Sequence, residues 1–487
     1  MKKILVANRG EIALRVMRTA HKMGISTVAI YSEADREAPF VTFAHEAYCV
    51  GPPPSSESYL QMEKIIQIAK DTGVDGIHPG YGFLSENADF AQMVSDAGIT
   101  FIGPKPESIR VMGSKLAAKN AVKDFGTPLV PGTDEAIEDP EEAKTIAKQI
   151  GFPILIKASA GGGGKGMRIV RNENELESQM DRAISEAKAS FGDGSVFIEK
   201  FVDSPRHIEI QILADTHGNV IHLFERECSI QRRHQKVVEE APSSKIDEVT
   251  RKAMGEAAIN AAKACDYVGA GTVEFLADAD NNFYFLEMNT RLQVEHPVTE
   301  MITGVDLVEQ QIRVARGEQL SIRQEDLSIH GHAIELRVYA EDAYENFMPS
   351  IGPLNTYRPP YGEGIRVDDG FEEGMNVPIY YDPMISKLSV HAENRNKAIA
   401  KMSSAIENYQ IEGIQTTLDF GHYVMNHPEF ISGHYDTQFV DRFFSADQLD
   451  EHLRPDMEVA AIAGLKLLER AWNRVKPIQT DTENYWS

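Results

Sequence analysis

The chain has 487 residues, too many for one ordinary hydrophobic core, which predicts two to four compact units around a shared cleft. Its 49 Lys and Arg stand against 74 Asp and Glu, a net charge of -25, which argues against a nucleic-acid or anionic-membrane partner. The three cysteines are far apart without CxxC spacing, which argues against a zinc site or a disulfide framework and fits a reducing compartment. Without a signal peptide or an apolar run near the ~18 residues of a membrane span, we expect a cytoplasmic protein.

The first hundred residues alternate short apolar runs with amphipathic helical stretches. This βαβ rhythm is typical of a parallel sheet. The apolar runs cover residues 4–7, 27–31, 76–78 and 100–103, and the helical stretches cover residues 12–23, 59–70 and 90–96. We therefore expect an N-terminal βαβ domain over residues 1–112 and a helical linker over residues 113–129.

The remainder of the chain changes character, because antiparallel-type alternation replaces the βαβ rhythm. The strands that carry this prediction are residues 153–158, 196–200, 207–213 and 220–227. The overall prediction is α/β followed by α+β, with a small domain over 130–201 and a large antiparallel-sheet domain over 202–446.

A helical extension is expected over residues 447–487, beginning with the charged segment 447–454, which has the composition of a linker. Beyond it, apolar residues recur on one face of a helix. They are Val459, Ile462, Leu465, Leu468 and Trp472. This face either packs on its own domain or docks a partner, and the sequence leaves both open.

A glycine-rich segment, residues 161–164, lies between Lys157 and Lys165. Without Cβ atoms, its backbone can approach a polyphosphate closely and point N–H groups at it, while the lysines neutralise charge. It matches neither the GxxxxGK[ST] nor the GxGxxG pattern. A phosphate-covering lid is the functional interpretation, and an exposed glycine turn without a ligand is the alternative.

Two strand-like runs flank the acidic turn 278–282 and predict a β-hairpin that places Glu274 opposite Glu287. Two carboxylates with the amide of Asn289 nearby suit Mg²⁺, which usually takes one or two protein carboxylates alongside nucleotide phosphates. Two solvated glutamates on a hairpin are the alternative.

Polar side chains crowd residues 289–297, where Arg291, Gln293 and Glu295 follow one another at alternate positions. An arginine can hold a small oxyanion and a nearby carboxylate can accept its proton. Upstream, residues 231–236 gather two arginines, a histidine and Lys236 in an otherwise acidic chain. This run is either a solvated face or part of an anion site, and the acidic background favours the anion site.

Five stretches taken in order resemble the biotin carboxylase branch of the ATP-grasp superfamily, over residues 1 to about 445. They are Ala7-Asn8-Arg9-Gly10-Glu11-Ile12-Ala13, His78 to Asn87, the glycine segment, Gln231 to Pro242 and Glu287 to Pro297. The resemblance implies an N-terminal pre-ATP-grasp domain, a small ATP-grasp lid and a large C-terminal domain. It also implies ATP-dependent carboxylation of biotin by bicarbonate through carboxyphosphate.

The resemblance assigns residues to the nucleotide and the metal. The residues implied to bind ATP are Lys115, Lys157, Gly163, Gly164, Glu199, Lys200, His207, Gln231, His234 and Leu276. Glu274, Glu287 and Asn289 are the implied ligands of Mg²⁺, for which Mn²⁺ can substitute. Metal and lysines would share the charge of phosphoryl transfer.

The same resemblance assigns the carboxylation chemistry. Lys236, Arg291, Gln293 and the Val294 backbone are implied to bind bicarbonate, and Tyr81 and Arg337 to bind biotin. Glu295 is the implied base, and Arg337 would stabilise the biotin enolate, since a guanidinium stays charged at working pH. Lys236 and Arg291 complete the predicted catalytic set.

A Met-Lys-Met biotin-attachment sequence does not occur in the chain. We therefore expect a biotin carrier protein and a carboxyltransferase on separate chains, and the resemblance implies a homodimer. The final acceptor, whether acetyl-CoA, propionyl-CoA or pyruvate, is not encoded here. A carbamoyl-phosphate-forming ligase and a scaffold without catalysis are the rival interpretations.

Overall fold

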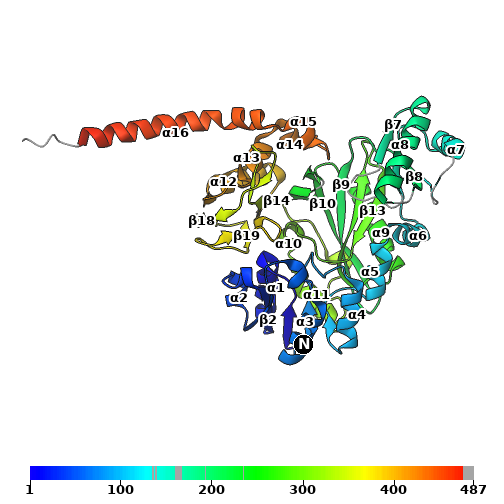
Figure 1. Cartoon of the computed structure of the whole chain (residues 1–487), viewed down its shortest axis with the longest axis horizontal. Helices are drawn as coiled ribbons and strands as arrows, with labels where there is room; N and C mark the ends of the chain where they lie inside the picture. Colours follow the sequence, from blue (N-terminus) through cyan, green and yellow to red (C-terminus); the bar gives the residue numbers. More distant parts are fainter. Residues whose placement is uncertain (134–136, 138–139, 159–166, 192–193, 234, 475–487) are drawn as a thin grey trace, which may run out of the picture.

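The computed structural model describes residues 1–133, 137, 140–158, 167–191, 194–233 and 235–474. Its elements form three main sheets (Figure 1). Each sheet has its own apolar core. No helix within these residues is long and apolar enough to cross a membrane.

The N-terminal sheet is parallel and has the order β3-β2-β1-β4-β5. Its strands are β1 (Lys3–Val6), β2 (Ser26–Ser32), β3 (Glu46–Gly51), β4 (Gly76–His78) and β5 (Thr100–Phe101). Helices α1 (Gly10–Lys22), α2 (Pro39–Phe43), α3 (Met62–Thr72), α4 (Ala88–Asp96) and α5 (Pro106–Gly113) accompany it. Strand β1 is apolar and buried from Ile4 to Val6 because helices shield a parallel sheet from water. The parallel sheet predicted from the βαβ rhythm is confirmed.

A small three-stranded antiparallel sheet follows α6 (Lys115–Lys123), with the order β7-β6-β8. Its strands are β6 (Ile154–Ala158), β7 (Met167–Val170) and β8 (Val196–Lys200), and α7 (Pro140–Ile150) and α8 (Glu173–Phe191) accompany it. Apolar residues of these elements make a separate core that includes Ile154, Ile198 and Met180. Because it has its own apolar core, this unit is a separate subdomain.

The third sheet has eight strands in the order β13-β12-β9-β10-β11-β14-β21-β19, and every pair of neighbouring strands runs antiparallel. Its strands are β9 (Arg206–Ala214), β10 (Val220–Arg232), β11 (Gln235–Ala241), β12 (Gly269–Ala277), β13 (Phe283–Asn289), β14 (His332–Tyr339), β19 (Ile365–Asp369) and β21 (Met384–Ala392). The predicted large antiparallel sheet is therefore confirmed. Its strands come from residues between Arg206 and Ala392. The sheet therefore places polar side chains that are far apart in the sequence on neighbouring strands.

Further helices and six short strands complete the described part of this region. The helices are α9 (Glu248–Ala264), α10 (His296–Thr303), α11 (Leu307–Ala315), α12 (Arg395–Glu407), α13 (Leu418–Asn426), α14 (Pro428–Ser432) and α15 (Phe439–Phe443). The short strands are β15 (Glu341–Asp342), β16 (Met348–Pro349), β17 (Gly352–Pro353), β18 (Thr356–Arg358), β20 (Asn376–Val377) and β22 (Gln410–Glu412).

The C-terminal helix α16 (Ala446–Arg474) leaves the body of the molecule as one long rod (Figure 1). The interpretation of residues 447–454 as a linker was wrong, because the helix already covers them. Asp447 lies in its first turn, where a negative charge favours the helix dipole, and Leu449 is buried in the neighbouring core. Further along, Val459, Ile462, Leu465 and Leu468 are exposed, so this face does not pack on its own domain.

Candidate active site

Neighbouring strands of the large sheet bring acidic and basic side chains together. Glu209 of β9 lies in register with Glu274 of β12 on one side and with Arg226 of β10 on the other. Lys236 follows on β11 and Arg337 on β14, the next two strands across the sheet. A polar cluster thus lies across the middle of a sheet whose strands are mostly buried.

Lys236 is the centre of this cluster. Its ammonium donates hydrogen bonds to carboxylate oxygens of Glu209 at 2.6 Å, Glu274 at 2.9 Å and Glu295 at 2.7 Å. Arg337 binds the other oxygen of Glu295 through Nη2 at 2.9 Å and donates from Nε to Glu239 at 2.6 Å. Glu295, fully buried, is therefore held between two cations from two strands.

The charge state of Glu295 follows from these partners. Burial penalises its carboxylate, yet the charges of Lys236, Arg337 and then Arg226 hold its pKa well below the usual range. The neighbouring carboxyl of Glu239 responds differently, because burial raises its pKa to about 8 in spite of Arg337. Near neutral pH, Glu295 is an ionised base that is aimed by two cations, whereas Glu239 is the more readily protonated of the two buried carboxyls.

Arg291 lies at the mouth of this cluster, half-buried, and its guanidinium contacts four groups. It donates to Glu86 at 2.6 Å, Gln293 Oε1 at 3.0 Å, Asn289 Oδ1 at 3.1 Å and the carbonyl of Leu292 at 3.3 Å. Glu86 belongs to the N-terminal domain, so this contact joins the parallel sheet to the large one. The arginine is held in place by protein groups while its surface remains accessible.

The predicted hairpin of β12 and β13 is confirmed, with Glu274 in register with Glu287. Although burial opposes ionisation, Lys236 and His207 hold the pKa of Glu274 well below its ordinary value. Partial burial, followed by the negative charge of Glu274, raises the pKa of Glu287. Part of the Glu287 side chain still reaches solvent. Two facing carboxylates that repel each other fit a divalent cation, which would relieve that repulsion. Asn289 donates to Glu274 at 2.9 Å, so its amide oxygen is directed elsewhere, toward Arg291.

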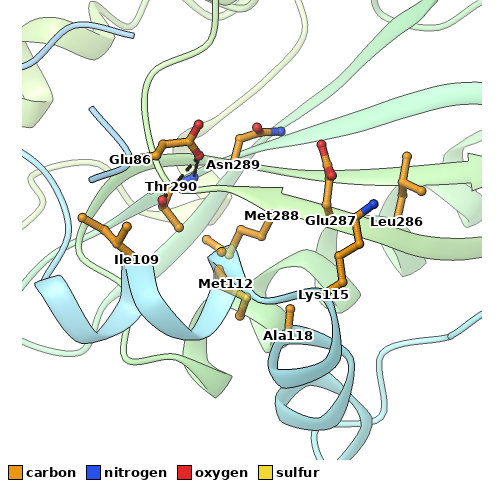
Figure 2. Close-up of a pocket in the computed structure, with 11 residues that line it drawn as sticks. Glu86, Ile109, Met112, Lys115, Ala118, Leu286, Glu287, Met288, Asn289 and Thr290 are labelled. Atoms are coloured by element: carbon orange, nitrogen blue, oxygen red, sulfur yellow. Dashed lines mark hydrogen bonds between the residues drawn. The ribbon is translucent and has the colours of Figure 1, made fainter. Parts of the chain in front are cut away.

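A cavity of about 280 Å³ opens beside Glu287 (Figure 2). Lys115 rises from α6 alongside Glu287, and Glu86, Asn289 and Thr290 lie toward the other end of the cavity. Met112 and Ala118 supply apolar lining. A lysine and a carboxylate beside an apolar wall suit a phosphorylated ligand carried with a metal ion.

The remaining residues predicted for the nucleotide lie on the surrounding strands. Lys157 of β6 and Lys119 of α6 both pair with the buried carboxylate of Glu199 on β8. Lys200 instead donates to the carbonyls of Gly151 at 2.9 Å and Phe152 at 3.1 Å. The small sheet therefore contributes Lys157 and Glu199, and α6 contributes the second lysine that this carboxylate holds.

His207 and Leu276 are neighbours in register on β9 and β12. The Nε2 atom of His207 lies 2.9 Å from Glu274, which ties the histidine to the predicted metal ligand. Gln231 donates to the carbonyl of Cys228 at 2.7 Å. Gly163, Gly164 and His234 lie outside the described residues, and their predicted roles remain predictions.

Tyr81 belongs to the N-terminal domain, where its backbone carbonyl accepts from Asn8 at 2.7 Å. Its ring centroid lies 5.9 Å from Lys387 Nζ, and that lysine donates to the carbonyl of Val294 at 2.9 Å. The residue predicted for biotin and the backbone predicted for bicarbonate are thus linked through a lysine that sequence reasoning missed.

Sequence reasoning also missed several acidic and basic members of the site. They are Glu86, Lys119, Glu209, Arg226, Glu239 and Lys387. Arg226 is fully buried and pairs with Glu209, with further bonds to Gln211 at 2.7 Å and Thr299 at 2.9 Å. Charged residues at alternate positions of otherwise apolar strands were the available signal. Within a single strand, however, the same alternation of charged and apolar residues is expected when one face of the strand is exposed to solvent.

Three family models match the chain in order. They are "Biotin carboxylase, N-terminal domain" over residues 1–109, "Carbamoyl-phosphate synthase L chain, ATP binding domain" over 114–323 and "Biotin carboxylase C-terminal domain" over 335–442. The biotin carboxylase of Halalkalibacterium halodurans is 54% identical over 439 residues, which cover 90% of this chain and 97% of that protein. The rat mitochondrial methylcrotonoyl-CoA carboxylase subunit alpha is 50% identical over 486 residues, covering 100% of this chain and 68% of that subunit.

Solved structures agree with this pattern. The Campylobacter jejuni biotin carboxylase in an ATP-type nucleotide complex is 50% identical with a TM-score of 0.84, covering 91% of this chain and 98% of that one. The biotin carboxylase domain dimer of the Hydrogenobacter thermophilus 2-oxoglutarate carboxylase, which holds MgADP and bicarbonate, is also 50% identical. Its TM-score is 0.82, with 90% and 97% of the two chains covered.

The fold, with its ATP-binding family match, and the cluster of paired carboxylates and cations define an ATP-dependent ligase. Within that class, the chain belongs to the biotin carboxylase family.

Proposed function

We propose that this chain transfers CO2 from bicarbonate to biotin at the expense of ATP, with the Lys236, Glu295 and Arg337 cluster as the reaction centre. The observation that carries the assignment is the geometry of Glu295, an ionised buried carboxylate whose two oxygens bind cations from two strands. Such a base is positioned before substrate arrives and is protected from water.

The reaction would begin when Glu295 takes the proton of bicarbonate and one bicarbonate oxygen attacks the γ-phosphorus of ATP. The bond from that phosphorus to ADP breaks, which gives ADP and carboxyphosphate. Carboxyphosphate then splits into phosphate and CO2. The released phosphate takes the proton from N1 of biotin, and N1 forms the new C–N bond to CO2. Arg337 would offset the negative charge on the ureido oxygen, and Lys236 the charge of the oxyanion.

Arg291, with Gln293 and the Val294 N–H, would hold bicarbonate beside Glu295. Lys115, Lys157 and His207 would face the phosphates, with the unassigned Lys119 as a further cation, while Glu199, Lys200 and Leu276 would frame the base. Gln231 and His234 would lie near the ribose, and Gly163 and Gly164 would cover the phosphates. Glu274, Glu287 and Asn289 would hold Mg²⁺, which supplies charge neutralisation at the phosphates when bound.

We keep the domain boundaries predicted from the sequence as part of this proposal. Residues 1–112 would supply Tyr81 and Glu86, residues 130–201 the lid, and residues 202–446 the base and metal ligands. Residues 113–129 would connect the first two, and residues 447–487 would form an extension. Limited proteolysis that cuts between these units, and not within them, would support the boundaries.

The chain would act with a biotin carrier and a carboxyltransferase, and would form a homodimer. Support comes from the acyl-CoA carboxylase alpha chains among its relatives and from the dimer in the Hydrogenobacter structure. The match to the rat subunit continues through the tail, whereas the match to the Halalkalibacterium enzyme covers only 90% of the chain. The exposed apolar side chains of α16 would then contact a partner chain within an acyl-CoA carboxylase complex.

We assign the reaction to the cytoplasm, which suits three cysteines that are all free. Cell fractionation with an antibody to the chain tests this placement, and recovery from an oxidising compartment would contradict it.

The direct test is fixation of ¹⁴C-bicarbonate on free biotin by purified protein with MgATP. We expect acid-labile label on biotin together with biotin-stimulated release of phosphate. Nucleotide binding without either signal, in protein shown to be folded, would contradict the proposal and favour a scaffold.

A further inference from the structure

The turn from Gln293 to Glu295 is held by a second set of buried groups, separate from Lys236 and Arg337. Lys387 of β21, fully buried, donates from Nζ to the carbonyl of Val294 at 2.9 Å. The ring of His296, also fully buried, lies with Nδ1 2.9 Å from the carbonyl of Gln293. Two consecutive carbonyls of the turn are thus bonded by side chains that are not among the residues predicted to bind bicarbonate.

The protonation state of His296 follows from its surroundings. Burial, followed by the positive charge of Lys387, lowers the pKa of His296 well below its ordinary value, so the ring is neutral. A carbonyl oxygen only accepts hydrogen bonds, so Nδ1 must be the ring nitrogen that carries the proton. The opposite nitrogen, Nε2, has no hydrogen-bond partner among the described residues.

The peptide between Gln293 and Val294 is trans, so its N–H points away from its carbonyl. Because His296 binds that carbonyl, the Val294 N–H is directed to the other side of the turn. No acceptor for this N–H occurs in the described part of the chain. A carbonyl that already accepts a hydrogen bond also polarises its amide, which makes the N–H a better donor.

Lys387 is itself fixed by its place in the sheet. It lies in register between Arg337 of β14 and Asp368 of β19, and its Nζ is 3.3 Å from Glu11 of α1. Gly370 packs closely against the start of α1. A Cβ atom at position 370 would lie only 2.6 Å from the backbone nitrogen of Glu11. The lysine therefore fastens the turn to both the large sheet and the N-terminal domain.

We propose that His296 and Lys387 are positioning residues for carboxylation, which aim the Val294 N–H and the Glu295 carboxylate at one small planar oxyanion. This inference rests on the proposed function, because it deepens the assignment of the bicarbonate pocket. Neither side chain needs to touch the substrate. Their removal should affect bicarbonate and leave the nucleotide site intact.

Steady-state kinetics of His296→Phe and Lys387→Met would test the inference. We expect the KM for bicarbonate to rise by about 10- to 100-fold, the range expected when one hydrogen bond to a critical group is lost. The KM for MgATP should stay within about twofold, and Lys387→Arg should recover part of the loss. Arg251→Met is the control, since it also breaks an ion pair with a buried carboxylate, that of Glu225, away from the turn. Equal rises in both KM values, or a lower melting temperature with unchanged kinetics, would overturn the inference.

Two measurements do not need turnover, so failure of the proposed function can be told apart from failure of this inference. ¹⁵N-histidine NMR, with the signal assigned by its loss in His296→Phe, should show a neutral Nδ1–H tautomer. ¹³C-bicarbonate binding to the MgADP-loaded protein should weaken in the same variant. An Nε2–H tautomer, an imidazolium, or unchanged bicarbonate binding in His296→Phe would contradict the positioning role even if the enzyme proves inactive.

Discussion

The two ends of the site differ in how far the protein alone organises them. At one end, each oxygen of Glu295 already binds a cation, and Lys236 is surrounded by three carboxylates. At the other, Lys115 and Glu287 line a cavity of about 280 Å³ that reaches solvent. The reacting end is therefore preorganised, which favours catalysis because no reorganisation is needed in the transition state. The open end depends on nucleotide and metal to complete it.

Removing the base should break the preorganised end most severely. In Glu295→Gln we expect the turnover number to fall by about 10³-fold or more, because general-base catalysis alone contributes roughly 10²–10⁴-fold. The dissociation constant for MgATP should stay close to that of the parent, since Glu295 does not line the cavity beside Lys115 and Glu287. Stopped-assay kinetics and nucleotide titration check both quantities, and near-normal turnover would show that the base is assigned wrongly.

Arg337→Met should have the next largest effect. It removes the charge proposed to stabilise the biotin enolate and leaves Glu239 and Glu295 without one cation. We expect carboxylation of biotin to fall by about 10²-fold, with biotin-independent ATP cleavage reduced less. Comparing labelled biotin with released phosphate separates the two steps. An equal loss in both would place Arg337 in the first step.

Glu287→Gln tests the open end. It removes one of two facing carboxylates, so we expect the Mg²⁺ concentration for half-maximal activity to rise by about tenfold with turnover largely recovered at saturation. Glu142→Gln, on the outer helix α7, is the control for loss of a negative charge. An unchanged Mg²⁺ requirement would remove Glu287 from the metal site.

Truncation after Ser445 should have the smallest effect on chemistry. The exposed apolar residues of α16 do not contact the reaction centre, so carboxylation of free biotin should stay within about twofold of the full chain. Co-purification with the acyl-CoA carboxylase partner should be lost. Retention of the complex would show that α16 is not the docking surface.

The fold could largely be predicted from the sequence, because the pattern of apolar residues differs between two regions. The first hundred residues alternate strands with helices, whereas the remainder has the alternation typical of antiparallel strands. The hairpin that pairs Glu274 with Glu287 was predicted for the same reason. Glu209 and Glu239 were not predicted as site residues, since a charged residue on one strand has no visible partner until neighbouring strands are placed. The segment 447–454 was misread because a charged, solvated helix and a charged linker have the same composition.

The central claim is that bicarbonate oxygen attacks ATP at the preorganised end, and isotope transfer tests it most directly. Purified protein would be given MgATP, biotin and ¹⁸O-bicarbonate, and the released phosphate analysed by mass spectrometry before the label exchanges with water. The account predicts one bicarbonate-derived ¹⁸O atom in each phosphate formed. Phosphate that takes its new oxygen from water would contradict it, because ATP would then be hydrolysed without carboxyphosphate.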